Sequence, residues 1–326
     1  MSLAPPRLLL GLIPWYSFLI VLGTVLAIVL AVKEEKRAGF EKDTILDFVL
    51  IVLPCGILGA RLYYVAFSWD LFRDDLISIL KIWEGGIAIY GAVIAGLLVA
   101  WLFTQKRKIS FFKLCDLIAP GLILAQSIGR WGNYFNQEAY GAIIQNPALQ
   151  FFPFGVQIQS DTGLQWHMAT FFYESFWDMM VFIFLIIARR KWFRIHGDVI
   201  CFYALLYACG RLVIEDFRMD SLYASNVRIS QLLSVIICAL VLIRYICLFR
   251  GKTSFRSVPV RTACVISFAA DTVTLLWLMN ILPVTVPTLL LRFMLLSLCG
   301  ILNILSLFIL YGKCAQGDLI YANQPV

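Results

Sequence analysis

Long apolar runs separated by short polar segments dominate the chain. An α-helix needs about 20 consecutive apolar residues to cross the hydrocarbon core of a bilayer. The runs of this length predict nine membrane-spanning helices, roughly at 12–32, 44–67, 87–104, 112–130, 169–188, 198–216, 230–249, 262–281 and 285–312. The pattern therefore predicts an all-α polytopic membrane protein.

The composition agrees with this fold class. Hydrophobic residues make up 61% of the 326 residues and charged residues only 14%, whereas soluble domains carry about 25% charged residues. The first apolar run is long for a signal peptide and lacks a small-residue cleavage pattern, so we expect it to be retained.

Basic residues gather in alternate loops, which predicts the orientation of the chain. Loops rich in lysine and arginine stay on the cytoplasmic side, so we expect the N-terminus outside and, with nine spans, the C-terminus inside. The net charge of +7 is then explained by the lipid bilayer rather than by nucleic acid. The predicted inner clusters are Lys33, Lys36, Arg37 and Lys42; Lys106, Arg107, Lys108 and Lys113; Arg189, Arg190, Lys191 and Arg194; and Arg250, Lys252, Arg256 and Arg261.

Cysteine usage indicates neither disulfides nor metal. The nine cysteines include no Cys-x-x-Cys pair, and none lies in the three long loops predicted outside. We therefore expect no metal site and interpret these cysteines as small packing residues in membrane helices.

Polar residues collect at the predicted outer ends of six helices. One charge at the centre of a membrane helix costs about 2.5–3.5 kcal/mol of insertion free energy. Charged groups near membrane helices therefore indicate a functional site. Tyr207, Arg211 and Glu215 recur every four residues and share one helix face. We expect the arginines of this group to meet its carboxylates. The group comprises Tyr16, Arg61, Tyr90, Arg130, Asn133, Asn136, Glu138, Glu174, Tyr207, Arg211, Glu215 and Arg218.

Structural alternatives stay open for the arginines. Arg61 could snorkel to the headgroups, and Arg130 and Arg211 could form purely structural ion pairs with nearby glutamates. If they instead bind a ligand, their planar guanidinium forks match phosphate oxygens, which points to an anionic phospholipid. No serine or cysteine nucleophile is evident on the predicted outer side, so the attacking group of an enzyme would come from a second substrate. A lipid transporter is the main alternative, but its path would require polar groups through the full membrane depth.

The segment Gly129 to Gly141 closely resembles the signature of prolipoprotein diacylglyceryl transferases, a family of bacterial membrane enzymes. The pattern Gly-Arg-x-Gly-Asn-x-x-Asn-x-Glu-x-x-Gly is met at all seven fixed positions. The resemblance covers roughly residues 10–250 and implies a seven-span core in 1–250. Residues 251–326 would be a C-terminal extension with two apolar runs separated by Pro283 and Pro287. Further matches are Trp83 to Gly91, Tyr173-Glu174 and Gly210 to Glu215.

The resemblance implies a reaction in the bacterial cytoplasmic (inner) membrane. The diacylglyceryl group of phosphatidylglycerol passes to the lipobox cysteine of a prolipoprotein, glycerol 1-phosphate leaves, and no metal or organic cofactor is needed. This would be the first step of lipoprotein maturation. Arg130 and Arg211 would bind the phosphate and stabilise the leaving group, with Glu138 as a further catalytic candidate. The implied substrate-binding residues are Tyr16, Asn133, Asn136, Gly141, Glu174, Tyr207 and Glu215. Arg61 is a further substrate-binding candidate from its position among the outer polar residues.

Tyr90 departs from the family pattern. Many members have at this position a histidine that has been discussed as a base, whereas tyrosine, with a pKa of about 10, is a poor base at neutral pH. Tyr90 remains a catalytic candidate by position. We favour activation of the substrate thiol, whose ordinary pKa is about 8.5, by the nearby arginines. The substitution also leaves open an inactive homologue that binds lipid or lipobox peptide.

Overall fold

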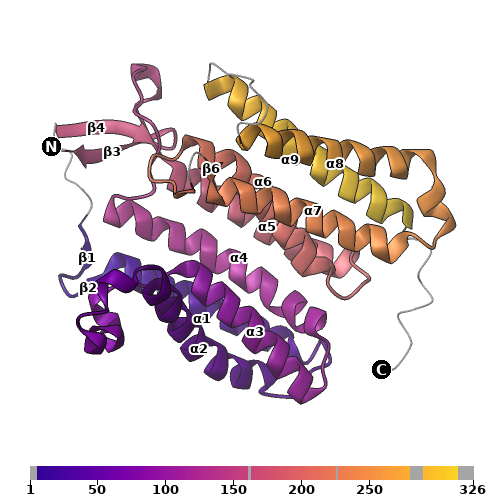
Figure 1. Ribbon diagram of the computed structural model, residues 1–326, viewed down its shortest axis with the longest axis horizontal. Coiled ribbons are helices and arrows are strands. Elements are labelled where there is room, and N and C mark those ends of the chain that lie inside the picture. Colours follow the sequence, from indigo (N-terminus) through magenta and orange to yellow (C-terminus); the bar gives the residue numbers. More distant parts are fainter. Residues whose placement is uncertain (1–5, 161–162, 225–226, 280–288, 315–326) are drawn as a thin grey trace. The chain divides into compact units, whose positions relative to one another are not determined.

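The computed structural model describes residues 6–160, 163–224, 227–279 and 289–314 and confirms a mostly helical membrane protein (Figure 1). A helix lies in each predicted apolar run; the end of the eighth run, the start of the ninth, and both Pro283 and Pro287 lie outside the described residues. The helices are α1 Trp15–Glu35, α2 Thr44–Phe67, α3 Ile89–Arg107, α4 Phe111–Asn136, α5 Thr170–Lys191, α6 Asp198–Ile214, α7 Ile229–Phe249, α8 Val258–Leu278 and α9 Leu289–Cys314.

Helix α6 is the short one. Within the described residues, eight helices are long and apolar enough to cross a membrane, while α6 has only 17 residues. Its predicted span reached residue 216, but the backbone tightens into the 3-10 helix η5 at Glu215–Phe217. The polar end of the predicted span is therefore a separate turn.

Short antiparallel hairpins in the loops were not predicted. In the longest, β3 (Gly155–Ser160) pairs with β4 (Gly163–Met168), so that Val156 faces His167. Two smaller pairs are β1 (Leu8–Leu9) with β2 (Ile13–Pro14), and β5 (Tyr223–Ala224) with β6 (Val227–Arg228). Five further 3-10 helices are η1 Trp69–Leu71, η2 Leu76–Leu80, η3 Ile82–Glu84, η4 Pro147–Leu149 and η6 Thr253–Arg256.

The chain forms two compact units. One comprises Met1–Thr24 and Leu122–Val326, and the other comprises Val25–Gly121, so α1 and α4 contribute residues to both. This division groups residues by contact, whereas the predicted boundary after residue 250 marks the end of a family resemblance. Helices α8 and α9 belong to the same unit as α5, α6 and α7.

In the unit Val25–Gly121, α2 and α3 lie side by side (Figure 1). They approach closely at a pair of glycines. A Cβ built on Gly59 would lie 2.8 Å from the carbonyl oxygen of Gly91, and one built on Gly91 would collide with Gly59 and Tyr63. Small residues let membrane helices approach in this way, because packing replaces the hydrophobic effect as the driving force there.

This close approach predicts that Gly91→Ala destabilises the protein. The added methyl group overpacks the α2–α3 contact, at a cost of about 1–3 kcal/mol, so the melting temperature in detergent should fall. Gly56→Ala is the matched control, because a Cβ at Gly56 meets nothing within 4 Å and alanine is the better helix former. Equal melting temperatures for the two variants would contradict the packing.

Candidate functional site

The signature segment forms the end of α4 and the turn after it. Gln137 and Ala139 have φ values of 55° and 56°, and these left-handed residues reverse the chain. Between them, Glu138 Oε1 accepts hydrogen bonds from the Nδ2 atoms of Asn133 and Asn136, both at 3.1 Å. Glu138 was predicted to meet the arginines. Among the described residues it instead accepts from these two asparagines, because the reversal turns it back onto α4.

Gly132 of the signature faces the start of α1. A Cβ built on Gly132 would lie 2.7 Å from Cδ2 of Tyr16, and the rings of Trp15 and Phe135 stack with centroids 4.7 Å apart. A side chain at Gly132 would therefore push Tyr16 away from the signature. This contact places Tyr16, a predicted substrate-binding residue, beside the site.

Buried ion pairs join α4, α5 and α6. Glu174, only 2% exposed, has its Oε1 atom 2.5 Å from Nη2 of Arg130, and both of its oxygens accept from Nη1 of Arg211 at 2.9 Å. Arg211 Nη2 also lies 2.5 Å from Oε2 of Glu215. The predicted meeting of Arg130 and Arg211 with Glu174 and Glu215 is confirmed.

A third arginine, Arg218, approaches the same carboxylate. Its Nη1 lies 3.9 Å from Oε2 of Glu174, and its guanidinium donates to both oxygens of Asp220 at 3.0 and 3.1 Å. Asp220 also accepts from the backbone N–H of Ala139 at 3.2 Å. Partial burial alone would raise the pKa of the Asp220 carboxyl, but the hydrogen bonds and charge of Arg218 hold it below its usual range. This contact ties the turn after α4 to the segment after α6.

Tyr207 and Asp178 complete the surroundings of Arg130. The Tyr207 hydroxyl is a hydrogen-bonding neighbour of Arg130, and its ring stacks on Tyr203. Asp178 is 0% exposed, and neither of its carboxylate oxygens has a hydrogen-bond partner among the described residues. The sequence reasoning missed Asp178. Its position four residues after Glu174, in an apolar run, was a signal that could have revealed it.

A mostly apolar cavity of about 270 Å³ lies beside the signature. Two of its lining residues are joined to each other: the hydroxyl of Ser127 donates to the carbonyl oxygen of Ser175, and that of Ser175 to the carbonyl oxygen of Ser127, each at 2.8 Å. These reciprocal bonds hold α4 against α5. The lining residues are Leu19, Ser127, Ile128, Trp131, Phe172, Ser175, Phe176 and Met179.

Gly141 and His167 contact each other in the structure, and the substrate-binding role predicted for Gly141 stays a prediction. A Cβ on Gly141 would lie 2.8 Å from the carbonyl oxygen of Phe217 and 2.9 Å from Thr170 Cγ2, so only glycine fits there without a shift. The Gly141 carbonyl oxygen accepts from Nδ1 of the buried His167 at 2.8 Å. Both residues fix the turn after α4.

Arg61 and Tyr90 belong to the unit Val25–Gly121. The buried guanidinium of Arg61 donates to backbone carbonyl oxygens, among them those of Gly85 at 2.6 Å and Gly86 at 2.8 Å. It donates further to Ser78, Ile79 and Lys81, so in this structure it organises the loop before α3. Tyr90 lies in the first turn of α3, with its ring 6.4 Å from that of Tyr63. The substrate and catalytic roles predicted for these two residues stay predictions.

The arrangement is suited to binding an anion. Arg130 retains 21% exposure of its side chain, and guanidinium groups present five N–H donors in a fixed fork, so donors remain beyond those that hold Glu174. In a dry site such charges act more strongly than in water. Among the described residues, no group of three or more histidine, cysteine, aspartate or glutamate side chains could hold a metal ion.

Comparisons with known proteins identify the family of the chain. Residues 8–247 match the model of the family described as prolipoprotein diacylglyceryl transferase. A protein of Streptococcus suis (strain 05ZYH33) with the name phosphatidylglycerol–prolipoprotein diacylglyceryl transferase is 44% identical over 243 residues, which cover 74% of this chain and 90% of that protein. A protein of the same name from Streptococcus pneumoniae (strain JJA) is 44% identical over 70% of this chain and 87% of its own length. The chain therefore belongs to the prolipoprotein diacylglyceryl transferase family.

Proposed function

We propose that this protein transfers the diacylglyceryl group of phosphatidylglycerol to the thiol of the lipobox cysteine of prolipoproteins and releases glycerol 1-phosphate. The observation that carries this proposal is the buried Arg130–Glu174–Arg211 network, which is built on residues of the family's motifs. The names of the similar streptococcal proteins support the same substrates.

The substrate phosphate would lie against Arg130 and Arg211, with the headgroup reaching the amides of Asn133 and Asn136. These amides are oriented by Glu138, which leaves their oxygens as acceptors for headgroup hydroxyls. An acyl chain would occupy the apolar cavity between α4 and α5, beside Trp131. In this assignment Glu174 holds the two cations close together before the lipid arrives.

In the reaction, the cysteine sulfur attacks the glycerol carbon that bears the phosphate oxygen. A carbon–sulfur bond forms, the carbon–oxygen bond breaks, and its electron pair leaves with glycerol 1-phosphate. The negative charge that develops on this oxygen is stabilised by the arginines. The same positive charges favour the thiolate over the thiol, and the thiol proton is released. Tyr90 remains a catalytic candidate by sequence position.

The proposed location is the bacterial cytoplasmic membrane, with the N-terminus and the arginine site on the outer side. The alternation of basic loops along the sequence supports this orientation. Prolipoproteins would then meet the site as they leave the cytoplasm.

A direct assay tests the function. Purified protein in detergent is given phosphatidylglycerol and a synthetic lipobox peptide, and mass spectrometry follows the peptide. We expect the peptide to gain the mass of a diacylglyceryl group, while a peptide with serine in place of the cysteine gains nothing. If folded protein produces no gain while another family member works alongside, the transferase proposal fails, and lipid transport or substrate binding without turnover would be favoured.

A further inference from the structure

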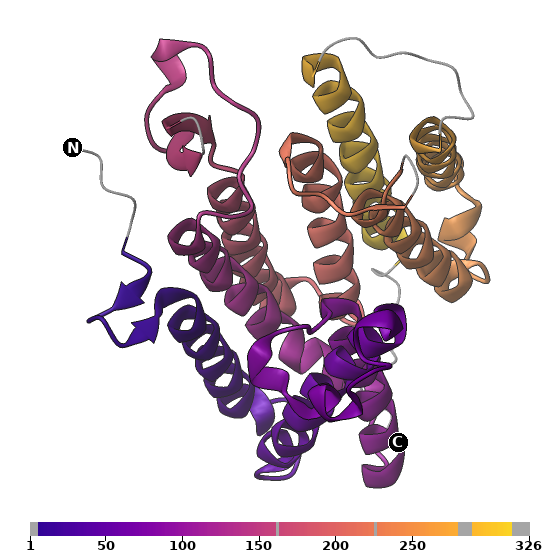
Figure 2. The same cartoon turned by 60° about the vertical axis from the view of Figure 1, so that its left-hand side comes forward.

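Helix α9, which lies beyond the family match, packs along the site helix α6 (Figures 1 and 2). At the start of α6, the Tyr311 hydroxyl donates to Oδ2 of Asp198 at 2.5 Å. In the middle, the Cys209 thiol lies 3.6 Å from the carbonyl oxygen of Gly300. Because residues early in α6 meet residues late in α9, the two helices run antiparallel.

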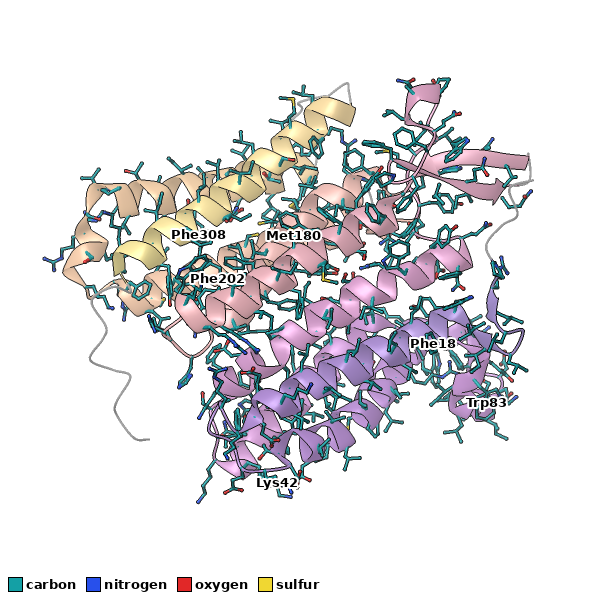
Figure 3. All side chains as sticks on the ribbon, turned by 180° about the vertical axis from the view of Figure 1, so that it is seen from behind. Phe18, Lys42, Trp83, Met180, Phe202 and Phe308 are labelled. Atoms are coloured by element: carbon teal, nitrogen blue, oxygen red, sulfur yellow. The ribbon has the colours of Figure 1, made fainter. Side chains whose placement is uncertain are left out.

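Aromatic packing strengthens the contact between α9 and the start of α6. Figure 3 shows Phe202 of α6 and Phe308 of α9 close together, and their ring centroids are 5.4 Å apart. Tyr311 also packs on Phe202, with centroids 5.8 Å apart. The start of α6 is therefore attached to α9 by both polar and apolar contacts.

A second attachment of α6, formed by ion pairs, lies just after its end. The buried carboxylate of Asp216 accepts on Oδ1 from Nη1 of Arg228 and from Nη2 of Arg292, each at 2.6 Å. The Arg292 guanidinium also lies over the ring of Trp277, 5.4 Å from its centroid. The starts of α7 and α9 thus meet at one carboxylate, and the end of α8 packs on the arginine that α9 contributes.

Asp216 is covalently next to a residue of the site. Glu215 and Asp216 share the 3-10 turn η5, and Glu215 forms the ion pair with Arg211. In so short a turn, the position of one side chain constrains the backbone of the next residue. Holding Asp216 therefore restricts Glu215, and through it the Arg211 guanidinium.

A buried polar network holds α9 in place against α8. The Asn303 side chain donates to Oδ1 of Asp271 at 2.7 Å, and the Ser267 hydroxyl donates to Oδ1 of Asn303 at 3.0 Å. Such bonds join helices in membranes, where unpaired polar groups are costly. The helix that carries Arg292 is therefore itself fixed by its partner helix.

We propose that helices α8 and α9 form a brace, meaning that they hold helix α6 in position. In this brace, Arg292 is a positioning residue that aligns Arg211 through Asp216 and Glu215. The change in kcat expected from this inference rests on the proposed function. It assigns a role to a segment that lies outside the family match, which ends at residue 247.

The kinetic test uses Arg292→Gln, with Arg292→Lys as the conservative variant and Arg256→Gln as control, because Arg256 is an exposed arginine of the same extension. We expect Arg292→Gln to lower kcat on the order of ten-fold, since small misplacements of a catalytic group are costly. Arg292→Lys should recover part of this loss, and Arg256→Gln should match wild type. In a Glu215→Gln background, Arg292→Gln should cause little further loss, because the two residues act in series.

Hydrogen–deuterium exchange tests the brace without relying on activity. Arg292→Gln should speed amide exchange in residues 211–219 and leave residues 95–107 of α3 unchanged. If the wild-type protein proves inactive and Arg292→Gln still speeds this exchange, the proposed function fails and the brace stands. The brace is overturned if exchange in 211–219 is unchanged, if kcat is unchanged in folded protein, or if the losses from Arg292→Gln and Glu215→Gln multiply.

Discussion

Arg130→Ala is expected to lower kcat/KM on the order of 10²–10³-fold, the usual cost of losing one group that stabilises developing negative charge. Arg130 is 2.5 Å from Glu174 and still partly exposed, so its guanidinium can face both its carboxylate partner and a lipid phosphate. Arg130→Lys should remain impaired, because an ammonium group keeps the charge but lacks the planar fork. The measurement is the initial rate of peptide modification at several phosphatidylglycerol concentrations.

The control for this prediction is Arg73→Ala. Arg73 is an exposed arginine that pairs with Asp70 and Asp74, and such surface pairs contribute little. Its rate and melting temperature should match those of wild type. A folded Arg130→Ala protein with a wild-type rate would contradict the assignment of Arg130 to the reaction.

Glu174→Ala is expected to damage both stability and activity. Glu174 is the shared partner of Arg130 and Arg211 and lies near Arg218. Removing one partner of a buried ion pair typically costs about 3–5 kcal/mol, because the remaining charge is buried and uncompensated. We expect a clearly lower melting temperature in detergent and no measurable transfer.

Glu174→Gln separates charge from shape, because it is close to isosteric but neutral. It should be more stable than Glu174→Ala and still inactive, since the arginines would repel one another without the carboxylate. Asp70→Asn, which alters an exposed ion pair, is the matched control and should change neither quantity. Wild-type stability and rate in Glu174→Gln would show that the network does not organise the site.

The helices could be predicted because apolar runs of membrane length leave a strong signal in the sequence. The Arg130 and Arg211 network could be expected because charges are rare in such runs and because Tyr207, Arg211 and Glu215 share a helical spacing. The short hairpins carry no comparable signal, since each consists of a few residues inside a loop.

Other features depend on contacts and backbone conformations that no local sequence pattern indicates. Arg61 is held by backbone carbonyl oxygens, which every residue type presents. The position of Glu138 follows from the left-handed backbone of its neighbours. Arg292 and Asp216 are 76 residues apart in the chain, and neither residue alone indicates the other.

In the proposed reaction, the arginine–glutamate network carries out diacylglyceryl transfer from phosphatidylglycerol. The most direct test quantifies the modified peptide and the released glycerol phosphate in one reaction, for wild type and for Arg130→Ala of confirmed fold. We predict equal amounts of the two products for wild type, and for Arg130→Ala a parallel fall in the rate of both products on the order of 10²–10³-fold. Peptide modification without release of glycerol phosphate, or undiminished production of both by Arg130→Ala, would contradict the account.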